Sequence, residues 1–578
     1  MRCDKKTAGH RRAGMLCPRA STPKEQGVES LSIGPYRHLD GAPEGSIYEE
    51  INLSSEDGLV LTSRPVRFYH QWTPSHSRVC IGAFGDCLYR TEGQAFYYDD
   101  RFVEGLTLPL PADTQRQFAN FGSYIVIMPD RYYYQPSTGA YGPIGATVEF
   151  NAHLSLESAA VVVDESSYDE VSDLTDYFQV GDRVRLQVNY LPPQSTIPEW
   201  RDVYVTLIVV SPHYIRVSDE EFPANCDSAV ATARISREIP PLEGMCVCHE
   251  RLFGYVGNTV YACRQGDVRN WYPKTDSDEE GYEKNTAHHK PFTACTVYRG
   301  KPVFLSEEGI STVYGDRPCA FSVADQPIWG VMAGAHRSLM TVGGRLYYVS
   351  RHGVTVYDGD EAEILSDMLG ERMLSGVAGS DGRRYYLSAT VERDGEPRRM
   401  NFVYSLKTDL WHCEDGLAFA DFVCRHGILY GLQLNRADGT ARLWRMSGEP
   451  QATDGDERSE LDESGVLGLG RFGYAALGVK EPCSVMELAE LAGDNPERGY
   501  LKRLMLRLAV GESSSVRVYL SCDGEPYRLM TEVTATGPKW VAIPISPNRA
   551  VSYRVRLEAT NQFKLYGIGR MYERRGLV

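Results

Sequence analysis

Several kinds of signal are missing from this chain of 578 residues. It has no run of about 18 apolar residues, which a membrane-spanning helix would need. Its basic N-terminal segment lacks an apolar stretch, so it is not a secretory signal. Helical periodicity is scarce, and the two clearest candidates, 364–374 and 481–493, are short. These absences favour a large soluble protein built almost entirely from β-strands.

Motifs that carry catalysis are missing as well. The chain has no G-x-S-x-G nucleophile elbow, no phosphate-binding G-x-x-x-x-G-K-[ST] loop and no H-E-x-x-H zinc motif. The Asp boxes of sialidase-type propellers are also absent. We therefore expect that the chain is not an enzyme, and the sequence singles out no catalytic and no cofactor-binding residue.

Metal ligands do not occur at the spacing that metal sites require. The 14 cysteines are scattered, and the tightest pair, Cys246 and Cys248, is a C-x-C rather than a C-x-x-C. The segment 276–281 resembles the start of an EF-hand loop, but an alanine stands at its twelfth position. The adjacent His288 and His289 have no further ligand near them in the sequence. We expect no metal and no cofactor, and thiols that are reduced and buried.

Positive charge is outweighed by negative charge. The chain has 61 Lys and Arg against 77 Asp and Glu, which gives a net charge of −16. A protein that wraps nucleic acid needs a basic surface for phosphate contacts, so sequence-specific DNA binding is not expected. An acidic balance remains compatible with a wall past which DNA slides, and it promotes solubility in general.

The chain does contain a repeat. Each unit has a small apolar strand, a polar turn with glycine, and a strand with two adjacent bulky residues. The five clearest units are 245–264, 292–315, 338–359, 376–391 and 421–435. Aligned on Phe253, Phe304, Tyr347, Tyr386 and Tyr430, they are spaced by 51, 43, 39 and 44 residues. Periods of about 40–50 residues with several strands each are typical of β-propeller blades, which bury their faces against neighbouring blades.

Two earlier segments, 79–100 and 118–136, resemble the same unit, which predicts about seven blades, with six to eight as the range. The stretch that follows them is too long for one blade. It contains VGDRVRLQVNY at 180–190, an opening typical of a small SH3-like or OB-like barrel. An OB-like fold can bind nucleic acid, but these strands lack the interleaved basic and aromatic residues that such binding uses. The alternative to blades is a generic β-meander with evenly spaced turns.

The predicted fold class is all-β: a β-propeller of about seven blades with an inserted small β-barrel and a C-terminal β-sandwich. The sandwich is expected because strands near the C-terminus alternate strictly between apolar and polar residues. The predicted domains are a disordered N-terminal arm (1–33, with Met15 as a second candidate start), first propeller blades (34–149), the inserted barrel (150–240), remaining blades (241–446), an acidic linker (447–480) and the sandwich (481–578).

Motifs along most of the chain resemble a family of tail proteins from tailed bacteriophages. FANFGSYIVIMPDRYYYQP at 118–136 resembles the family's S-M-G-A-Y-(I/V)-I-I-(F/M)-P-D-K-K-Y signature, and RLFGYVGNTVYACRQGDVRNW at 251–271 resembles a second one. IYEEINLSSEDGLVLTSRPVR at 47–67 resembles the opening stretch, although 60–62 replace a proline-containing run. The other matches keep the same order, at 292–318, 376–389, 404–415, 501–510 and 563–576.

The resemblance implies a virion structural protein, similar to the tail-nozzle and packaged-DNA-stabilisation (hub) proteins of short-tailed phages. It implies a homo-oligomeric ring below the portal, which forms part of the DNA conduit in the tail or neck after assembly in the host cytoplasm. The implied partners are further copies of the chain and other tail and connector proteins. Genomic DNA would pass without sequence-specific binding, and no membrane is involved.

Two other functions stay open. One is a carbohydrate-binding or glycan-cleaving propeller involved in receptor recognition. It would gather carboxylates and aromatic rings at one mouth of the propeller. The other is a protein-interaction scaffold of propeller type.

Overall fold

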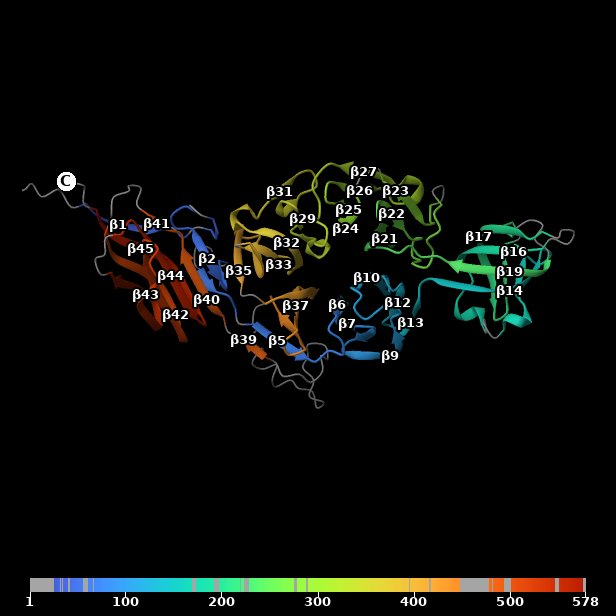
Figure 1. The fold of residues 1–578 in the computed structure, drawn as a ribbon, viewed down its shortest axis with the longest axis horizontal. Helices are drawn as coiled ribbons and strands as arrows, with labels where there is room; N and C mark the ends of the chain where they lie inside the picture. The colour runs from blue at the N-terminus through green and yellow to red at the C-terminus, as the bar shows by residue number, and fades with distance from the viewer. Residues whose placement is uncertain are drawn as a thin grey trace, which may run out of the picture.

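The protein consists of three all-β domains in a row. A computed structural model describes residues 25–574 except 32, 34, 40–41, 56–60, 66, 169–172, 192–196, 219, 223–227, 275–277, 287–289, 394, 415–416, 448–477, 481, 493–499 and 546–549. A closed barrel lies at one end, a propeller in the middle and a sandwich at the other end (Figure 1). No helix within these ranges is long and apolar enough to span a membrane.

Seven antiparallel sheets form the blades of the propeller. The first two are β6 (Val79–Phe84), β7 (Cys87–Glu92), β8 (Ala95–Tyr98) and β9 (Arg101–Thr107), then β10 (Gln117–Phe121), β11 (Tyr124–Met128), β12 (Tyr132–Gln135) and β13 (Ala140–Pro143). The third and fourth are β20 (Gly244–Cys248), β21 (Arg251–Val256), β22 (Thr259–Ala262) and β23 (Tyr282–Asn285), then β24 (Phe292–Tyr298), β25 (Lys301–Ser306), β26 (Ile310–Tyr314) and β27 (Ser322–Gln326).

The fifth and sixth are β28 (Met340–Val342), β29 (Arg345–Ser350), β30 (Gly353–Tyr357) and β31 (Ala362–Ile364), then β32 (Arg372–Ser380), β33 (Arg384–Arg393), β34 (Glu396–Ser405) and β35 (Leu410–Glu414). The seventh is β36 (Phe419–Arg425), β37 (Ile428–Asn435), β38 (Thr440–Arg445), β5 (Arg67–Trp72) and β39 (Gly478–Lys480). Short 3-10 turns are η3 (Pro318–Ala320), η4 (His336–Ser338) and η5 (Asp367–Leu369).

The ring of blades is closed by strands from distant parts of the chain. Strand β5 precedes the first blade in sequence, yet it pairs with β38 of the last blade, with Trp72 opposite Ala441 and Tyr69 opposite Trp444. The first strands of most neighbouring blades contact one another around the axis. This pairing joins the start of the propeller to its end. The ring therefore cannot open at the seventh blade unless the pairing between β5 and β38 breaks.

The repeat seen in the sequence has a packing reason. Its aligned bulky residues lie in the second strand of their blades and are buried between blades. Small residues on the first strand make room for such rings. Gly82 lies opposite Tyr89, and Gly244 opposite Tyr255. A Cβ atom at Gly82 would come within 2.4 Å of the Tyr89 ring. The predicted propeller and its number of blades are confirmed.

The inserted barrel is also confirmed. Its strands are β14 (Ala146–Ser155), β15 (Ala160–Val163), β18 (Tyr214–Val217), β17 (Glu199–Ser211), β16 (Arg183–Tyr190) and β19 (Ser228–Arg237), with 3-10 turns η1 (Glu165–Ser167) and η2 (Leu174–Asp176). Alternate residues of β16 point inward, which is why the period-two pattern marked it. The chain enters by β14 and leaves by β19, and these two strands pair with each other from Ala146 opposite Arg237 onward.

The sandwich is built from both ends of the chain. Its strands are β1 (Glu25–Leu31), β2 (Ile47–Ile51), β3 (Leu53–Ser54), β4 (Leu61–Ser63), β40 (Cys483–Leu488), β41 (Leu491–Ala492), β42 (Tyr500–Cys522), β43 (Arg528–Pro544), β44 (Ser552–Thr560) and β45 (Phe563–Arg574). The first half of β42 pairs with β45 and its second half with β44, so this strand links the two sides of one continuous ten-stranded sheet.

The structure differs from the predicted domain boundaries near the N-terminus. Residues 34–149 were expected to hold only propeller blades, and 1–33 a disordered arm. Instead β1 pairs with β45, and β2 pairs with β40, so the segment 25–63 completes the sandwich. Residues 1–24 lie outside the described ranges. Pairing between strands more than 400 residues apart leaves no local pattern, so the sequence did not reveal it.

The two predicted helices are wrong. The segment 481–493 forms β40 and β41, because β40 is held between β2 and β44 and sheet pairing overrides its helical spacing. The segment 364–374 contains the end of β31, the turn η5 and the start of β32. The greater part of the predicted acidic linker 447–480 lies outside the described residues, as do His288 and His289.

Candidate functional site

The propeller axis was the first place to search for a site. The innermost strands, β6, β10, β20, β24, β28, β32 and β36, contain a single carboxylate, that of Asp421. It forms an ion pair with Arg337 and accepts a hydrogen bond from the backbone nitrogen of Phe422 at 2.8 Å. Glycan cleavage commonly needs a pair of carboxyl groups. The innermost strands do not supply that pair.

A cavity of about 710 Å³ lies instead between the barrel and the propeller, and we call it the junction cleft. Its walls come from the second and third blades and from the barrel. Its aromatic lining is Tyr204, Tyr261, Trp271 and Tyr272, its basic lining is Arg131, Arg183, Arg234 and Arg237, and its acidic lining is Asp130, Glu238 and Glu283. Domain boundaries of this kind are common places for ligand sites.

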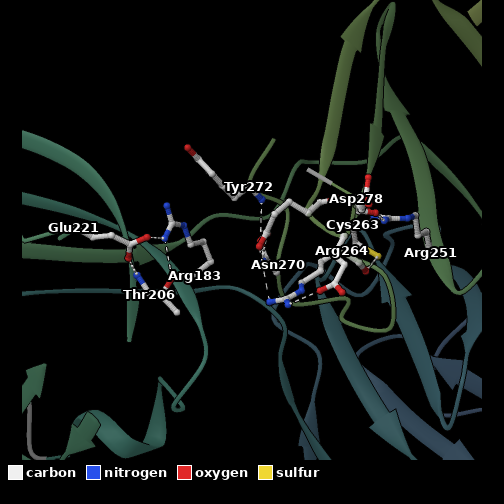
Figure 2. Close-up of polar contacts among 11 residues, drawn as sticks. Arg183, Thr206, Glu221, Arg251, Cys263, Arg264, Asn270, Tyr272 and Asp278 are labelled. Atoms are coloured by element: carbon white, nitrogen blue, oxygen red, sulfur yellow. Dashed lines mark hydrogen bonds and ion pairs between the residues drawn. The ribbon is translucent and has the colours of Figure 1, made fainter. Parts of the chain in front are cut away.

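Tyr272 of the propeller reaches across to the barrel (Figure 2). The centroid of its ring lies 4.6 Å from that of Tyr204 on β17. The guanidinium carbon of Arg183 on β16 lies 4.7 Å from the same ring centroid, within cation–π range. The aromatic wall of the cleft is therefore also the contact that sets the barrel against the propeller.

Arg183 is held in place on the barrel side. It donates a hydrogen bond to Thr206 Oγ1 at 2.7 Å and forms an ion pair with Glu221, as Figure 2 shows. Burial would raise the pKa of Glu221, but hydrogen bonds from Arg183 and from the Thr206 backbone outweigh burial and lower this pKa. Glu221 is therefore ionised at neutral pH, and the charge of Arg183 is already neutralised inside the protein.

On the propeller side a buried arginine shapes the loop that carries Tyr272. Arg251 is fully buried and donates to the carbonyl oxygens of Cys263, Glu280 and Asp278 at 2.8, 2.7 and 3.0 Å. These hydrogen bonds hold together the two ends of the loop that follows β22. The backbone nitrogen of Tyr272 then donates to Asn270 Oδ1 at 3.0 Å. Arg251 thus positions the aromatic wall without touching the cleft.

A second polar cluster lies where the sandwich meets the propeller, and we call it the buried seam. Strands β2 and β3 of the sandwich contact β35 of the sixth blade there. Ser55 Oγ lies 2.7 Å from His412 Nε2, and His412 Nδ1 lies 2.5 Å from Glu50 Oε1. Beside them, Arg67 on β5 of the seventh blade and Glu414 on β35 of the sixth form a two-pronged ion pair within the propeller. The seam thus buries two charge pairs.

The seam places serine, histidine and glutamate in the order of a catalytic triad. Ser55 is only 2% exposed, and it lines neither of the two cavities described in this section. A nucleophile needs room for its substrate, so the geometry supports a structural network. No motif spacing could have revealed it, because His412 is more than 350 residues from its two partners.

The sandwich contains a second cavity, of about 640 Å³. Glu487, Glu490, Asp523 and Glu525 line it, and Arg554 lies 3.8 Å from Glu487. Within the described residues, no group of three His, Cys, Asp or Glu side chains could hold a metal ion. All eleven described cysteines are unpaired, but only four of them are buried, fewer than we expected.

No family model and no curated protein sequence matches the chain. Solved structures do match. An exo-β-1,3-galactanase from Phanerochaete chrysosporium is 10% identical over 55% of this chain and 96% of its own, with a TM-score of 0.20. A family 43 arabinoxylan arabinofuranohydrolase from Bacillus subtilis is 10% identical over 56% and 94%, with a TM-score of 0.18. A β-propeller domain from Myceliophteria thermophila is 9% identical over 65% and 100%, with a TM-score of 0.23.

These likenesses bear on the fold alone, and they correct one expectation. We expected that the chain is not an enzyme, because its sequence has no catalytic motif. The matching structures include several glycoside hydrolases. Missing motifs do not by themselves exclude activity, because catalytic groups can come from strands that lie far apart in sequence.

Proposed function

We propose that the chain binds glycans in the junction cleft. The observation that carries this proposal is the gathering of aromatic rings, carboxylates and guanidinium groups around one cavity of about 710 Å³. Ligand clefts commonly have volumes of roughly 300–1,000 Å³ and combine apolar or aromatic walls with a few convergent polar groups. The apolar faces of sugar rings pack on aromatic rings, while their hydroxyls bond to carboxylates and arginines.

The aromatic wall of the cleft is held in position by contacts within the protein, without a ligand. Arg251 fixes the loop that carries Tyr272, and the ring of Tyr272 is held between Tyr204 and Arg183. Tyr261 on β22 lines the same cavity beside Glu283 of β23, with which it pairs in register. A rigid wall lowers the entropy lost on binding, which favours affinity for a flexible oligosaccharide.

A glycan array followed by titration calorimetry on the full chain tests this proposal. Tyr261→Ala should weaken binding about tenfold, because losing an aromatic anchor typically costs more than about 1 kcal/mol. Trp200→Ala is the matched control, because this exposed aromatic residue of the barrel does not line the cleft. Product release from bound oligosaccharides, with Glu238→Gln and Glu283→Gln, tests for cleavage. No binding to any glycan, or equal losses in both alanine variants, would overturn the proposal.

A second proposal is a virion structural role in the tail or neck of a bacteriophage, as part of a ring-shaped DNA conduit with other tail and connector proteins. The ordered motifs described above support it. So does the barrel surface. Of 17 large apolar side chains exposed in the described residues, nine lie in the barrel: Leu156, Tyr168, Tyr177, Val180, Leu191, Ile197, Trp200, Ile208 and Tyr214. Exposed apolar surface of this extent often marks a contact with another protein.

The ring proposal predicts assembly through the barrel. A ring of identical subunits needs an interface in which one patch meets a different patch on its neighbour. Electron microscopy of the purified protein should show rings, and Ile197→Asp with Trp200→Asp should leave monomers. Phe102→Asp, on the propeller strand β9, is a control with a similarly exposed ring. A protein that is monomeric at all concentrations and absent from purified virions would exclude this role.

A further inference from the structure

The junction cleft carries more positive than negative charge once its internal ion pairs are counted. Asp130 is neutralised by Arg116, whose Nε lies 2.8 Å from its carboxylate. Arg237 forms an ion pair with Asp182 and donates to the Ile144 carbonyl oxygen at 2.7 Å. These groups are already ion-paired within the protein, and a ligand could bind them only by breaking buried pairs.

Two further lining groups also have ion-pair partners, at more exposed positions. Arg183 is paired with Glu221, as described above. Glu238 lies 3.1 Å from Arg185, which is also bound by Asp202. After these pairs are set aside, the charged lining that remains is Arg131, Arg234 and Glu283.

Arg131 and Arg234 stand on opposite sides of the cleft. Arg131 lies in the turn between β11 and β12 of the second blade, and Arg234 lies on β19 of the barrel. Both side chains are exposed, and neither has a hydrogen-bond or ion-pair partner within the described part of the chain. Glu149 and Gln187 flank Arg234 in register, yet neither bonds to it.

Two arginines that form no ion pair line one cleft of a chain whose net charge is −16. The planar fork of an arginine donates two parallel hydrogen bonds to a carboxylate, a sulfate or a phosphate. A neutral sugar makes no use of that charge. The two arginines therefore favour an anion beside the aromatic wall formed by Tyr204, Tyr261 and Tyr272, while Glu283 leaves the remaining charged lining with one net positive charge.

We propose that the junction cleft recognises acidic glycans, and that Arg131 and Arg234 hold the sugar carboxylate or sulfate from the propeller side and the barrel side. This inference rests on the proposed glycan binding. It assigns the aromatic rings to the sugar faces and the two arginines to the acidic group. Binding would then draw the barrel and the propeller together across their junction.

Binding of matched oligosaccharide pairs to the full chain tests the inference. A trigalacturonate is compared with its methyl ester, and a sulfated oligosaccharide with its desulfated form. The acidic member of at least one pair should bind about tenfold or more tightly than its neutral partner, because hydrogen bonds to charged groups are worth about twice neutral ones. The two pairs distinguish a carboxylate ligand from a sulfate ligand.

Substitutions locate the acidic group. Arg131→Gln and Arg234→Gln should each weaken binding of the acidic member about tenfold and narrow the difference between the acidic member and its neutral partner. Arg101→Gln is the matched control, because this exposed arginine of β9 does not line the cleft. Unchanged thermal unfolding of all three variants shows that the fold is intact.

The outcomes separate this inference from the proposed function. If no glycan binds, the proposed function itself is wrong, and this inference falls with it. If neutral and acidic partners bind equally and the arginine variants are unaffected, only this inference is wrong. If single-stranded DNA or polyphosphate binds instead, and the arginine variants lose that binding, the acidic-glycan assignment is wrong.

Discussion

The propeller is joined to its two neighbouring domains in opposite ways. At the buried seam, Glu50 of the sandwich pairs with His412 of the propeller, and both side chains are almost wholly removed from water. At the other junction, barrel and propeller meet through partly buried rings beside the junction cleft. The chain connections also differ, since the paired strands β14 and β19 carry the barrel while segments from both ends of the chain build the sandwich.

The difference indicates which of the two domain junctions can change its geometry. A buried ion pair resists any change that separates its partners, because each charge left alone in a dry interior costs several kcal/mol. Stacked, partly exposed rings contribute only about 0.5–1.5 kcal/mol. We therefore expect the sandwich and propeller to behave as one unit and the barrel to adjust. A ligand site at the weaker junction fits that division.

The largest effect is expected at the seam. Glu414→Ala would leave the buried guanidinium of Arg67 without its carboxylate partner. This should lower the free energy of unfolding by about 3–5 kcal/mol. Glu238→Ala at the cleft removes an equivalent charge from an exposed position and should change stability by less than about 0.5 kcal/mol. Urea unfolding measures both, and equal losses would erase the contrast between the junctions.

The seam should also make stability depend on pH. Burial lowers the pKa of His412, but the charge and hydrogen bond of Glu50 outweigh burial, and the net shift is upward from 6.5. A raised folded-state pKa means that the stabilising contribution is complete below pH 6.5 and is lost as pH rises through the folded value. Unfolding free energies from pH 6 to 9 should fall in the native chain and fall less in His412→Gln. Parallel slopes would contradict the assignment.

A smaller effect is expected at the barrel junction. Tyr272→Ala removes both the stack on Tyr204 and the cation–π contact with Arg183, which together should contribute about 1–2 kcal/mol. Hydrogen exchange of β16 and β17 should quicken while that of β35 stays unchanged. Tyr272→Phe keeps the ring and should behave like the native chain. Faster exchange at the seam would show that the two junctions are coupled.

The smallest effect is expected at the rim of the cleft. Arg185 forms ion pairs with Asp202 and Glu238, but these side chains are 32%, 45% and 49% exposed, respectively. Surface pairs of this kind contribute about 0–1 kcal/mol and are screened by salt. Arg185→Gln should therefore shift the urea midpoint by no more than that amount. A loss approaching that of Glu414→Ala would mean that the rim is structurally as important as the seam.

Local patterns were sufficient for part of this architecture. The bulky residues at Phe253, Phe304, Tyr347, Tyr386 and Tyr430 predicted the blades, because a buried strand pair needs large residues on one strand and small ones on its partner. The alternation in 180–190 predicted a barrel strand, because alternate residues of a barrel strand face the interior. Such features depend on neighbours a few residues away, and the sequence shows them directly.

Other features were not visible in the sequence. The segment 481–493 has helical spacing, yet it forms strands because β2 and β44 hold it on both sides. The junction cleft joins Arg131, Tyr204 and Tyr272, which no motif connects, and the missing catalytic motifs led to a wrong expectation about enzymes. These residues meet only after the barrel has folded back on the propeller.

The sequence by itself determined the all-β class, the number of blades and the inserted barrel, because alternating burial is set by short-range geometry within each strand. Only the tertiary structure decided how the ring closes, how both termini build one sandwich, and which charges remain unpaired in the cleft. Those outcomes depend on pairing between strands hundreds of residues apart. Such pairing is stabilised by the surface that the strands bury against each other, and it leaves no periodic pattern in the sequence.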